Sequence, residues 1–97
     1  MEVGVCYISL RLHGIRNLKG KRGISKSLIS RISKRFNVSI SEIEDNDLWQ
    51  RLTIGVVCVS NDQRYSNKII GDVIDYIGDM NGEVEMVDSR IDSAGFF

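Results

Sequence analysis

Five basic residues lie close together near the N-terminus, and their side chains could bind phosphate. They are Arg16, Lys19, Lys21, Arg22 and Lys26. Asn17 is a suitable N-cap, so these cations would surround the start of a helix and face the positive end of its dipole. A phosphate at the free N–H groups would relieve that repulsion. The alternative is a solvated basic face that pairs with acidic loops elsewhere in the chain.

A second candidate site is the sequence Trp49-Gln50-Arg51, at the expected start of a strand. An exposed indole next to a guanidinium group could stack on a base of single-stranded nucleic acid. Trp49 and Arg51 therefore join the candidate nucleic-acid interface. The alternative is that Trp49 covers the edge of the core, because the chain has no aromatic run typical of RNA-recognition folds.

Other polar residues have simpler explanations than catalysis. Four carboxylates near the middle of the chain could attract a divalent cation, but their spacing fits no EF-hand loop, and we expect no metal site. They are Glu42, Glu44, Asp45 and Asp47. His13 has no nucleophile in a motif beside it, and residues 60–62 are suited to capping a helix. The glycines of residues 14–23 form neither a dinucleotide loop nor a Walker loop. We expect no enzyme activity and no cofactor.

The elements that would position these residues follow from the apolar pattern. Residues 3–13 are apolar on both faces, which predicts a central strand, and residues 18–36 have the spacing of an amphipathic helix weakened in its first turns by two glycines. Residues 37–44 and 49–60 predict two strands joined through the polar loop 45–47.

A second helix and a fourth strand complete the pattern. Asn61 or Asp62 would cap a second helix that reaches about residue 80 and ends at Asn81-Gly82. Residues 83–91 predict a last strand, with a bulge where the alternation slips between Met86 and Val87.

This order predicts an α+β fold of the ferredoxin-like β-α-β-β-α-β type, a four-stranded antiparallel sheet with two helices on one face. We expect one domain over residues 1–97, with a core at about 2–92 and a tail at 93–97. The other face of the sheet would be uncovered and partly apolar. Phe96 and Phe97, or a second copy of the chain, could cover it.

The charges divide the chain into two halves although the formal net charge is zero. Residues 1–41 carry nine basic groups and one acidic group, a balance of +8, whereas residues 42–97 carry four basic and twelve acidic groups, a balance of −8. The chain is therefore a charge dipole in sequence.

The remaining composition indicates a cytoplasmic protein. Cys6 and Cys58 lie inside apolar strands rather than in a metal or disulfide pattern, which fits a reducing compartment. No segment has the 18 or so consecutive apolar residues of a membrane span, and the first residues lack a signal-peptide pattern. We expect no export and no membrane partner.

Four segments carry a resemblance to a known family. They are residues 17–22 (NLKGKR), 35–39 (RFNVS), 47–51 (DLWQR) and 55–62 (GVVCVSND). In these segments, and in order over residues 3 to about 91, the chain resembles the YlxP-like family of small bacterial proteins, a domain of unknown function. The resemblance implies a ferredoxin-like fold and supplies no catalytic residues. Genes of the family often neighbour those for translation initiation and ribosome maturation, which implies work on RNA or the ribosome.

Two functions follow as hypotheses. The first is a non-enzymatic accessory protein that contacts ribosomal or other structured RNA through its basic first helix. The alternative is a homodimer or partner-binding module that uses the open sheet face without direct RNA contact.

Overall fold

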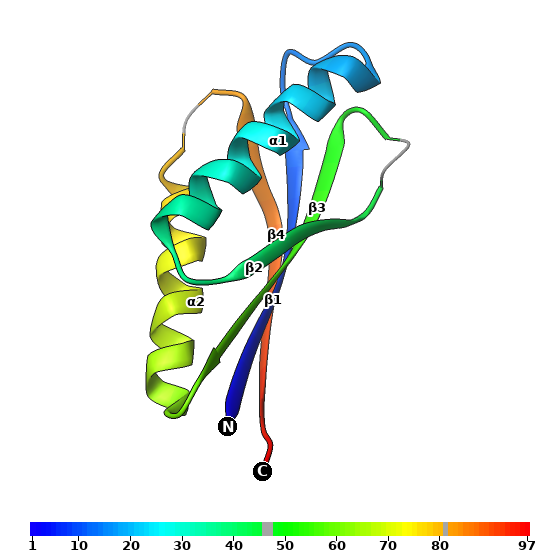
Figure 1. Cartoon of the computed structure of the whole chain (residues 1–97). Coiled ribbons are helices and arrows are strands. Elements are labelled where there is room, and N and C mark those ends of the chain that lie inside the picture. Colours follow the sequence, from blue (N-terminus) through cyan, green and yellow to red (C-terminus); the bar gives the residue numbers. More distant parts are fainter. Residues whose placement is uncertain (46–47, 81) are drawn as a thin grey trace.

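A computed structural model describes residues 1–45, 48–80 and 82–97, and it confirms the predicted order of elements (Figure 1). The elements are β1 (Glu2–Leu12), α1 (Leu18–Arg35), β2 (Ser39–Glu44), β3 (Arg51–Ser60), α2 (Gln63–Gly78) and β4 (Val84–Gly95). The four strands form one sheet in the order β2-β3-β1-β4, and the pairs are all antiparallel. This is the ferredoxin-like α+β fold that the sequence predicts.

Strand β1 lies in the centre of the sheet, as its apolar residues on both faces predicted. Its helix-side residues pack into one core with helix-side residues of β3 and with apolar side chains of both helices. The fully buried members are Cys6, Ile8, Leu10, Leu12, Leu28, Ile32, Leu52, Ile54, Val56, Cys58, Ile70, Val73 and Ile77. A side chain of this kind stabilises the fold by about 1.5–3 kcal/mol when fully buried.

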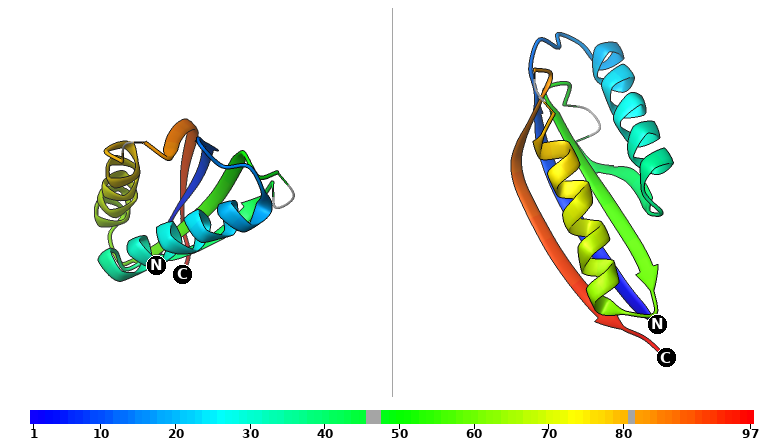
Figure 2. Two further views of the ribbon diagram at one scale, coloured as in Figure 1. Left: turned by 90° about the horizontal axis from the view of Figure 1, so that it is seen from above. Right: turned by 90° about the vertical axis from the view of Figure 1, so that its left-hand side faces the viewer.

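Both helices cover the same face of the sheet, but at different places (Figure 2). Helix α2 packs on β1, β3 and β4, whereas α1 lies towards β2 and crosses the strands at an angle. Leu28 and Ile32 of α1 reach the core, and so do Ile70 and Val73 of α2. The opposite face of the sheet is left without a helix.

The predicted bulge is present in β4. Ser9 of β1 lies opposite Asp88, whereas the next residue, Leu10, lies opposite Met86, so Val87 is the extra residue. Strand β4 also continues to Gly95, four residues beyond the predicted end, because its last residues pair with the start of β1. The predicted tail therefore begins later, at Phe96.

Several boundaries differ from the sequence prediction. Trp49 lies in a turn before β3 rather than in the strand, and α2 ends at Gly78. Phe97 is fully exposed and Phe96 about half exposed, so these two side chains do not cover the open sheet face. The predicted loop at Asn46 and Asp47 and the helix stop at Asn81 fall outside the described residues.

Among the described residues, no helix is both long enough and apolar enough to cross a membrane.

Candidate nucleic-acid interface

The start of α1 is fixed by a tight turn and a side-chain cap. Gly14 has a φ of +75°, a left-handed conformation that glycine adopts without steric cost and that lets the chain leave β1. Asn17 then caps the helix, because its Oδ1 accepts a hydrogen bond of 2.8 Å from the Gly20 backbone N–H. The predicted cap is confirmed, and the two glycines of the first turns do not prevent the helix.

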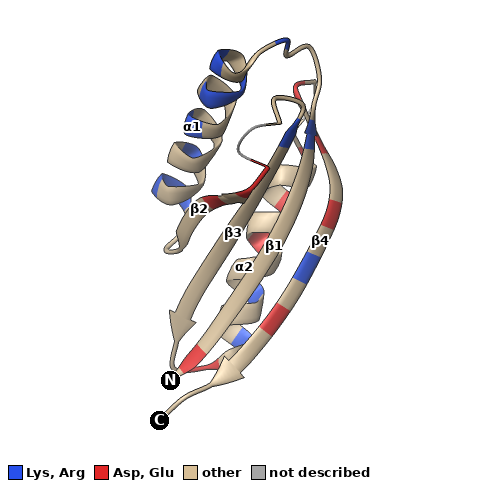
Figure 3. Cartoon of the chain, turned by 90° about the vertical axis from the view of Figure 1, so that its right-hand side faces the viewer, with Lys and Arg blue, Asp and Glu red and all other residues tan. Residues whose placement is uncertain are grey.

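Exposed cations follow this start along α1. The helix contains seven basic residues and no acidic residue, and six of the seven are exposed (Figure 3). Spacings of three and four residues place Lys19, Arg22 and Lys26 on one flank, and Arg16 is exposed just before the helix. Like charges at these spacings destabilise a helix by roughly 0.2–0.5 kcal/mol per pair.

Lys21 does not belong to that exposed surface, which corrects the sequence prediction. Its side chain is only 2% exposed, and its Nζ lies 2.9 Å from Glu42 Oε2 of β2. Glu42 Oε2 is buried and receives no hydrogen bond from the described residues, so the Lys21 ammonium group is what balances its charge. Lys21 shares a helix face with Ser25, Leu28 and Ile32, and this spacing was the signal in the sequence that it would face inward.

Asp45 connects this buried lysine to the turn before β3. It has a φ of +63°, and its carbonyl oxygen accepts hydrogen bonds from Lys21 Nζ and from the Leu48 N–H. Its carboxylate accepts a hydrogen bond of 2.6 Å from Thr53 Oγ1. Lys21 therefore fixes the start of α1 relative to the turn that carries Trp49 and leads into β3 at Arg51.

The end of the sheet adds an arginine that the sequence reasoning missed. Arg11 of β1 lies directly opposite Arg51 of β3, so the two exposed guanidinium groups extend from the same face. The pairing is continued by a hydrogen bond of 2.8 Å from the Leu12 N–H to the Gln50 carbonyl. Only the strand register brings these residues together, since forty positions separate them in the chain.

The charges are unevenly distributed in space as well as in sequence. Most basic residues lie on α1 and at the adjacent ends of β1 and β3, whereas α2 and β4 carry Arg64, Lys68 and Arg90 among several carboxylates, and the acidic strand β2 lies beside α1 (Figure 3). Cations thus gather at one end and one side of the molecule. This arrangement produces a local positive field although the net charge is zero.

The other polar candidates are accounted for by local contacts. His13 Nε2 lies 2.7 Å from Glu85 Oε1 on an exposed edge. Asp62 caps α2 by accepting a hydrogen bond of 2.9 Å from the Arg64 N–H, as predicted.

Burial raises the pKa of the Cys6 thiol to about 11, which keeps it protonated and unreactive at neutral pH. No group of three or more metal-ligating side chains occurs within residues 1–45, 48–80 and 82–97.

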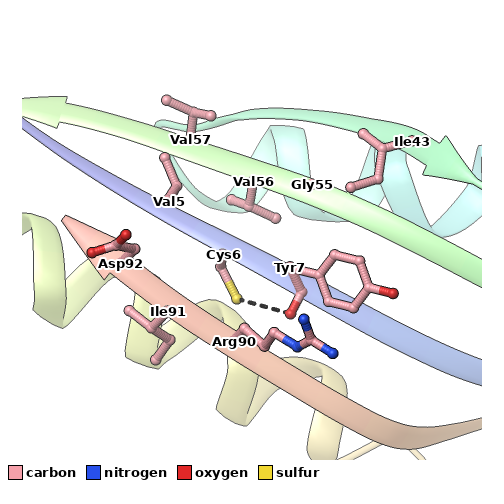
Figure 4. A pocket seen from close by; sticks show the side chains of 10 residues that line it. All are labelled: Val5, Cys6, Tyr7, Ile43, Gly55, Val56, Val57, Arg90, Ile91 and Asp92. Carbon is pink, nitrogen blue, oxygen red and sulfur yellow. Dashed lines mark hydrogen bonds between the residues drawn. The ribbon is translucent and has the colours of Figure 1, made fainter. Parts of the chain in front are cut away.

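The open sheet face carries an apolar hollow of about 460 Å³ (Figure 4). Val5 and Tyr7 of β1, Gly55 and Val57 of β3, and Ile43 of β2 contribute to its lining. At one side Arg90 stacks over the Tyr7 ring, with the guanidinium carbon 5.2 Å from the ring centroid. Val57 and nearby Val59 are exposed, so this face has the apolar character that a partner surface needs.

Comparison with known proteins places the whole fold in one sequence family. Residues 3–91 match the family model described as "Protein of unknown function (DUF503)". The chain is also 33% identical over 88 residues to the "Uncharacterized protein YlxP" of Bacillus subtilis (strain 168), a match that covers 91% of this chain and 95% of that protein. Neither description states an activity.

Proposed function

Because the chain belongs to the DUF503 family of proteins of unknown function, we propose its role from its own surface: it binds ribosomal or other structured RNA without catalysis. The observation that carries the proposal is α1, which has six exposed cations and no carboxylate. We propose that the protein binds RNA in the cytoplasm.

The energetics of α1 support a role for its cations in binding. Lys19 and Arg22 lie near the positive end of the helix dipole, and Arg22 and Lys26 repel each other across one turn. Each arrangement lowers helix stability, and neither is compensated by a carboxylate within the helix. Phosphate groups would supply the missing negative charge.

The proposal is tested by measuring affinity for structured ribosomal RNA fragments by fluorescence anisotropy at several salt concentrations. Four phosphate contacts, from Arg16, Lys19, Arg22 and Lys26, give a slope of about −3 on a log–log plot. The variant Arg16→Glu/Lys19→Glu/Arg22→Glu should lose this binding. Lys21 is left unchanged, because its reversal would disrupt the buried pair with Glu42 and confuse unfolding with loss of binding. Weak binding that is indifferent to salt would contradict the proposal.

A second candidate function is self-association through the open sheet face. It is favoured by the exposed side chains of Val5, Val57 and Val59 around the apolar hollow, and a second copy of the chain would cover them. Light scattering at tens of micromolar should then give a dimer mass, and Val57→Lys should give a monomer mass. A monomer mass for the unchanged protein would contradict this candidate.

A further inference from the structure

Two hollows meet where β1 ends and β3 begins. The first has a volume of about 420 Å³ and is lined by Arg11, Leu12, His13, Gly14, Ile15, Gln50 and Arg51. The second has a volume of about 200 Å³ and is lined by Leu48, Trp49, Gln50 and Arg51. Because Gln50 and Arg51 line both, the hollows adjoin, and together they have a basic part and an indole part. We call this pair of hollows the strand-end site.

The basic part of the strand-end site suits a phosphate group. Arg11 and Arg51 are directly opposite each other on neighbouring strands, so their Cβ atoms are about 5 Å apart. Neither side chain forms an ion pair with any residue in the described ranges. Two arginine side chains that start so close can bring both guanidinium groups to one anion, and each group has a planar set of donors that matches phosphate oxygens. A phosphate between them would accept hydrogen bonds from both and balance their charge.

A carboxylate of β4 lies beside this pair. Glu85 of β4 is opposite Arg11 in the strand register, on the side away from Arg51. Its Oε1 is 2.7 Å from His13 Nε2, so His13 already holds that oxygen. The side of Arg11 that faces Arg51 is therefore left for an anion.

The indole part of the strand-end site suits a base. Trp49 is partly exposed in the turn before β3, and it is two residues from Arg51. This turn is held by Asp45, whose carbonyl accepts hydrogen bonds from Leu48 and from the buried Lys21. A base that stacks on a positioned aromatic ring strengthens the binding of single strands, and every base has a face that can stack.

We propose that the strand-end site binds one nucleotide of a single-stranded RNA segment, with the phosphate between Arg11 and Arg51 and the base stacked on Trp49. This inference rests on the proposed RNA binding and adds a single-stranded contact to the phosphate contacts of α1. Both surfaces lie at the same end of the molecule, because β1 leads through the loop at residues 13–17 directly into α1 (Figure 3). One RNA that unpairs beside a helical region could occupy both.

The sole tryptophan of the chain makes the proposal directly measurable. The full chain is titrated with single-stranded RNA octamers of uridine and of adenosine, and Trp49 emission and the anisotropy of an end-labelled octamer are recorded in parallel. Stacking should quench the emission, and the quenching should saturate at the same concentration as the anisotropy. Arg11→Gln/Arg51→Gln should lower the affinity roughly tenfold or more and make the log–log salt slope shallower by about 0.7 for a shared phosphate.

The control is Arg64→Gln/Lys68→Gln, which removes two exposed cations from α2 and should leave the Trp49 quenching unchanged. Thermal unfolding of each variant confirms that it is folded. If the octamers bind with unchanged Trp49 emission, or if Arg11→Gln/Arg51→Gln binds as the unchanged protein does, the strand-end proposal is overturned. Structured RNA bound through α1 would still support the proposed function in that case. Absence of binding to both single-stranded and structured RNA would overturn both proposals.

Discussion

The two helices of this protein cover the same sheet but differ in their charges, which are of both signs in α2 and all positive in α1. Helix α2 begins with an Asp62 cap that binds Arg64, and its Lys68 Nζ lies 2.9 Å from Asp72 Oδ2 one turn later. Helix α1 has an uncharged cap, no acidic residue and seven basic residues. Both helices bury an apolar stripe, so the fold itself requires no such difference. The charges of α2 pair within the helix, whereas Lys19 and Arg22 lie near the positive end of the α1 dipole with no carboxylate in the helix to pair with, and the proposed RNA binding rests on this difference.

Lys21 is the exception within α1, and its removal should have the largest effect on stability. Lys21→Met leaves the buried oxygen of Glu42 without its counter-charge and should lower the free energy of unfolding by about 2–3 kcal/mol, given that Glu42 is still 24% exposed. Urea denaturation measures the change. Adding Glu42→Gln to this variant should restore part of the loss, because no buried charge is then left unpaired. If Lys21→Met leaves the free energy of unfolding unchanged, as the loss of an exposed lysine would, the buried pair with Glu42 is not formed.

Each helix has a glycine in its interior, Gly23 in α1 and Gly71 in α2, and the two positions offer a matched comparison. A Cβ at Gly23 of α1 or at Gly71 of α2 would have no neighbour within 4 Å, so alanine fits at both positions. Each Gly→Ala change should raise the free energy of unfolding by roughly 0.5–1 kcal/mol. The RNA affinity of Gly23→Ala should stay the same or rise, because the cations of α1 are kept. A loss of stability at Gly23 alone would mean that α1 is strained in a way that α2 is not.

Reversal of one charge should separate stability from binding in α1. Lys19→Glu places a carboxylate near the helix N-terminus and beside Arg22, which should raise the free energy of unfolding by about 0.5 kcal/mol. The same change should weaken RNA binding. Chemical denaturation and anisotropy measure the two effects in the same sample. If stability and affinity both fall, the cations of α1 contribute to folding rather than opposing it.

The two caps should differ in their response to acid. Hydrogen bonds from the Arg64 side chain and backbone N–H lower the pKa of the Asp62 carboxyl below its usual 3.8. The stabilisation from this carboxylate is therefore complete above about pH 4 and is lost as the pH falls through the lowered pKa. The difference in Tm between the unchanged protein and Asp62→Asn should shrink in that range, whereas the Asn17 cap of α1 does not titrate. A difference that is constant with pH would argue against the charged cap.

The sequence predicted the fold better than the site, for a physical reason. Alternation identified the central strand, and the slip at Val87 identified the bulge, because both depend on neighbouring residues. The last residues of β4 lack such a pattern, and they form a strand because the backbone of β1 is there to pair with. Arg11 and Arg51 lie opposite each other only because of the register between β1 and β3, which the pattern within each strand does not determine. The sequence prediction put Lys21 on the exposed surface because of its charge. Its spacing from Ser25, Leu28 and Ile32 already indicated the buried face of the helix.

The most direct test of the account is the RNA affinity of two charge-reversal pairs, one on each helix. Lys19→Glu/Arg22→Glu changes α1, and Arg64→Glu/Lys68→Glu changes the net charge equally on α2, where both side chains are exposed. Anisotropy with a structured ribosomal RNA fragment should show the α1 pair weakened tenfold or more, with a log–log salt slope shallower by about 1.4 to 1.8. The α2 pair should bind within about twofold of the unchanged protein, because its cations are already paired with carboxylates. Equal weakening by both pairs, or by neither, would contradict the claim that α1 is the RNA-binding surface.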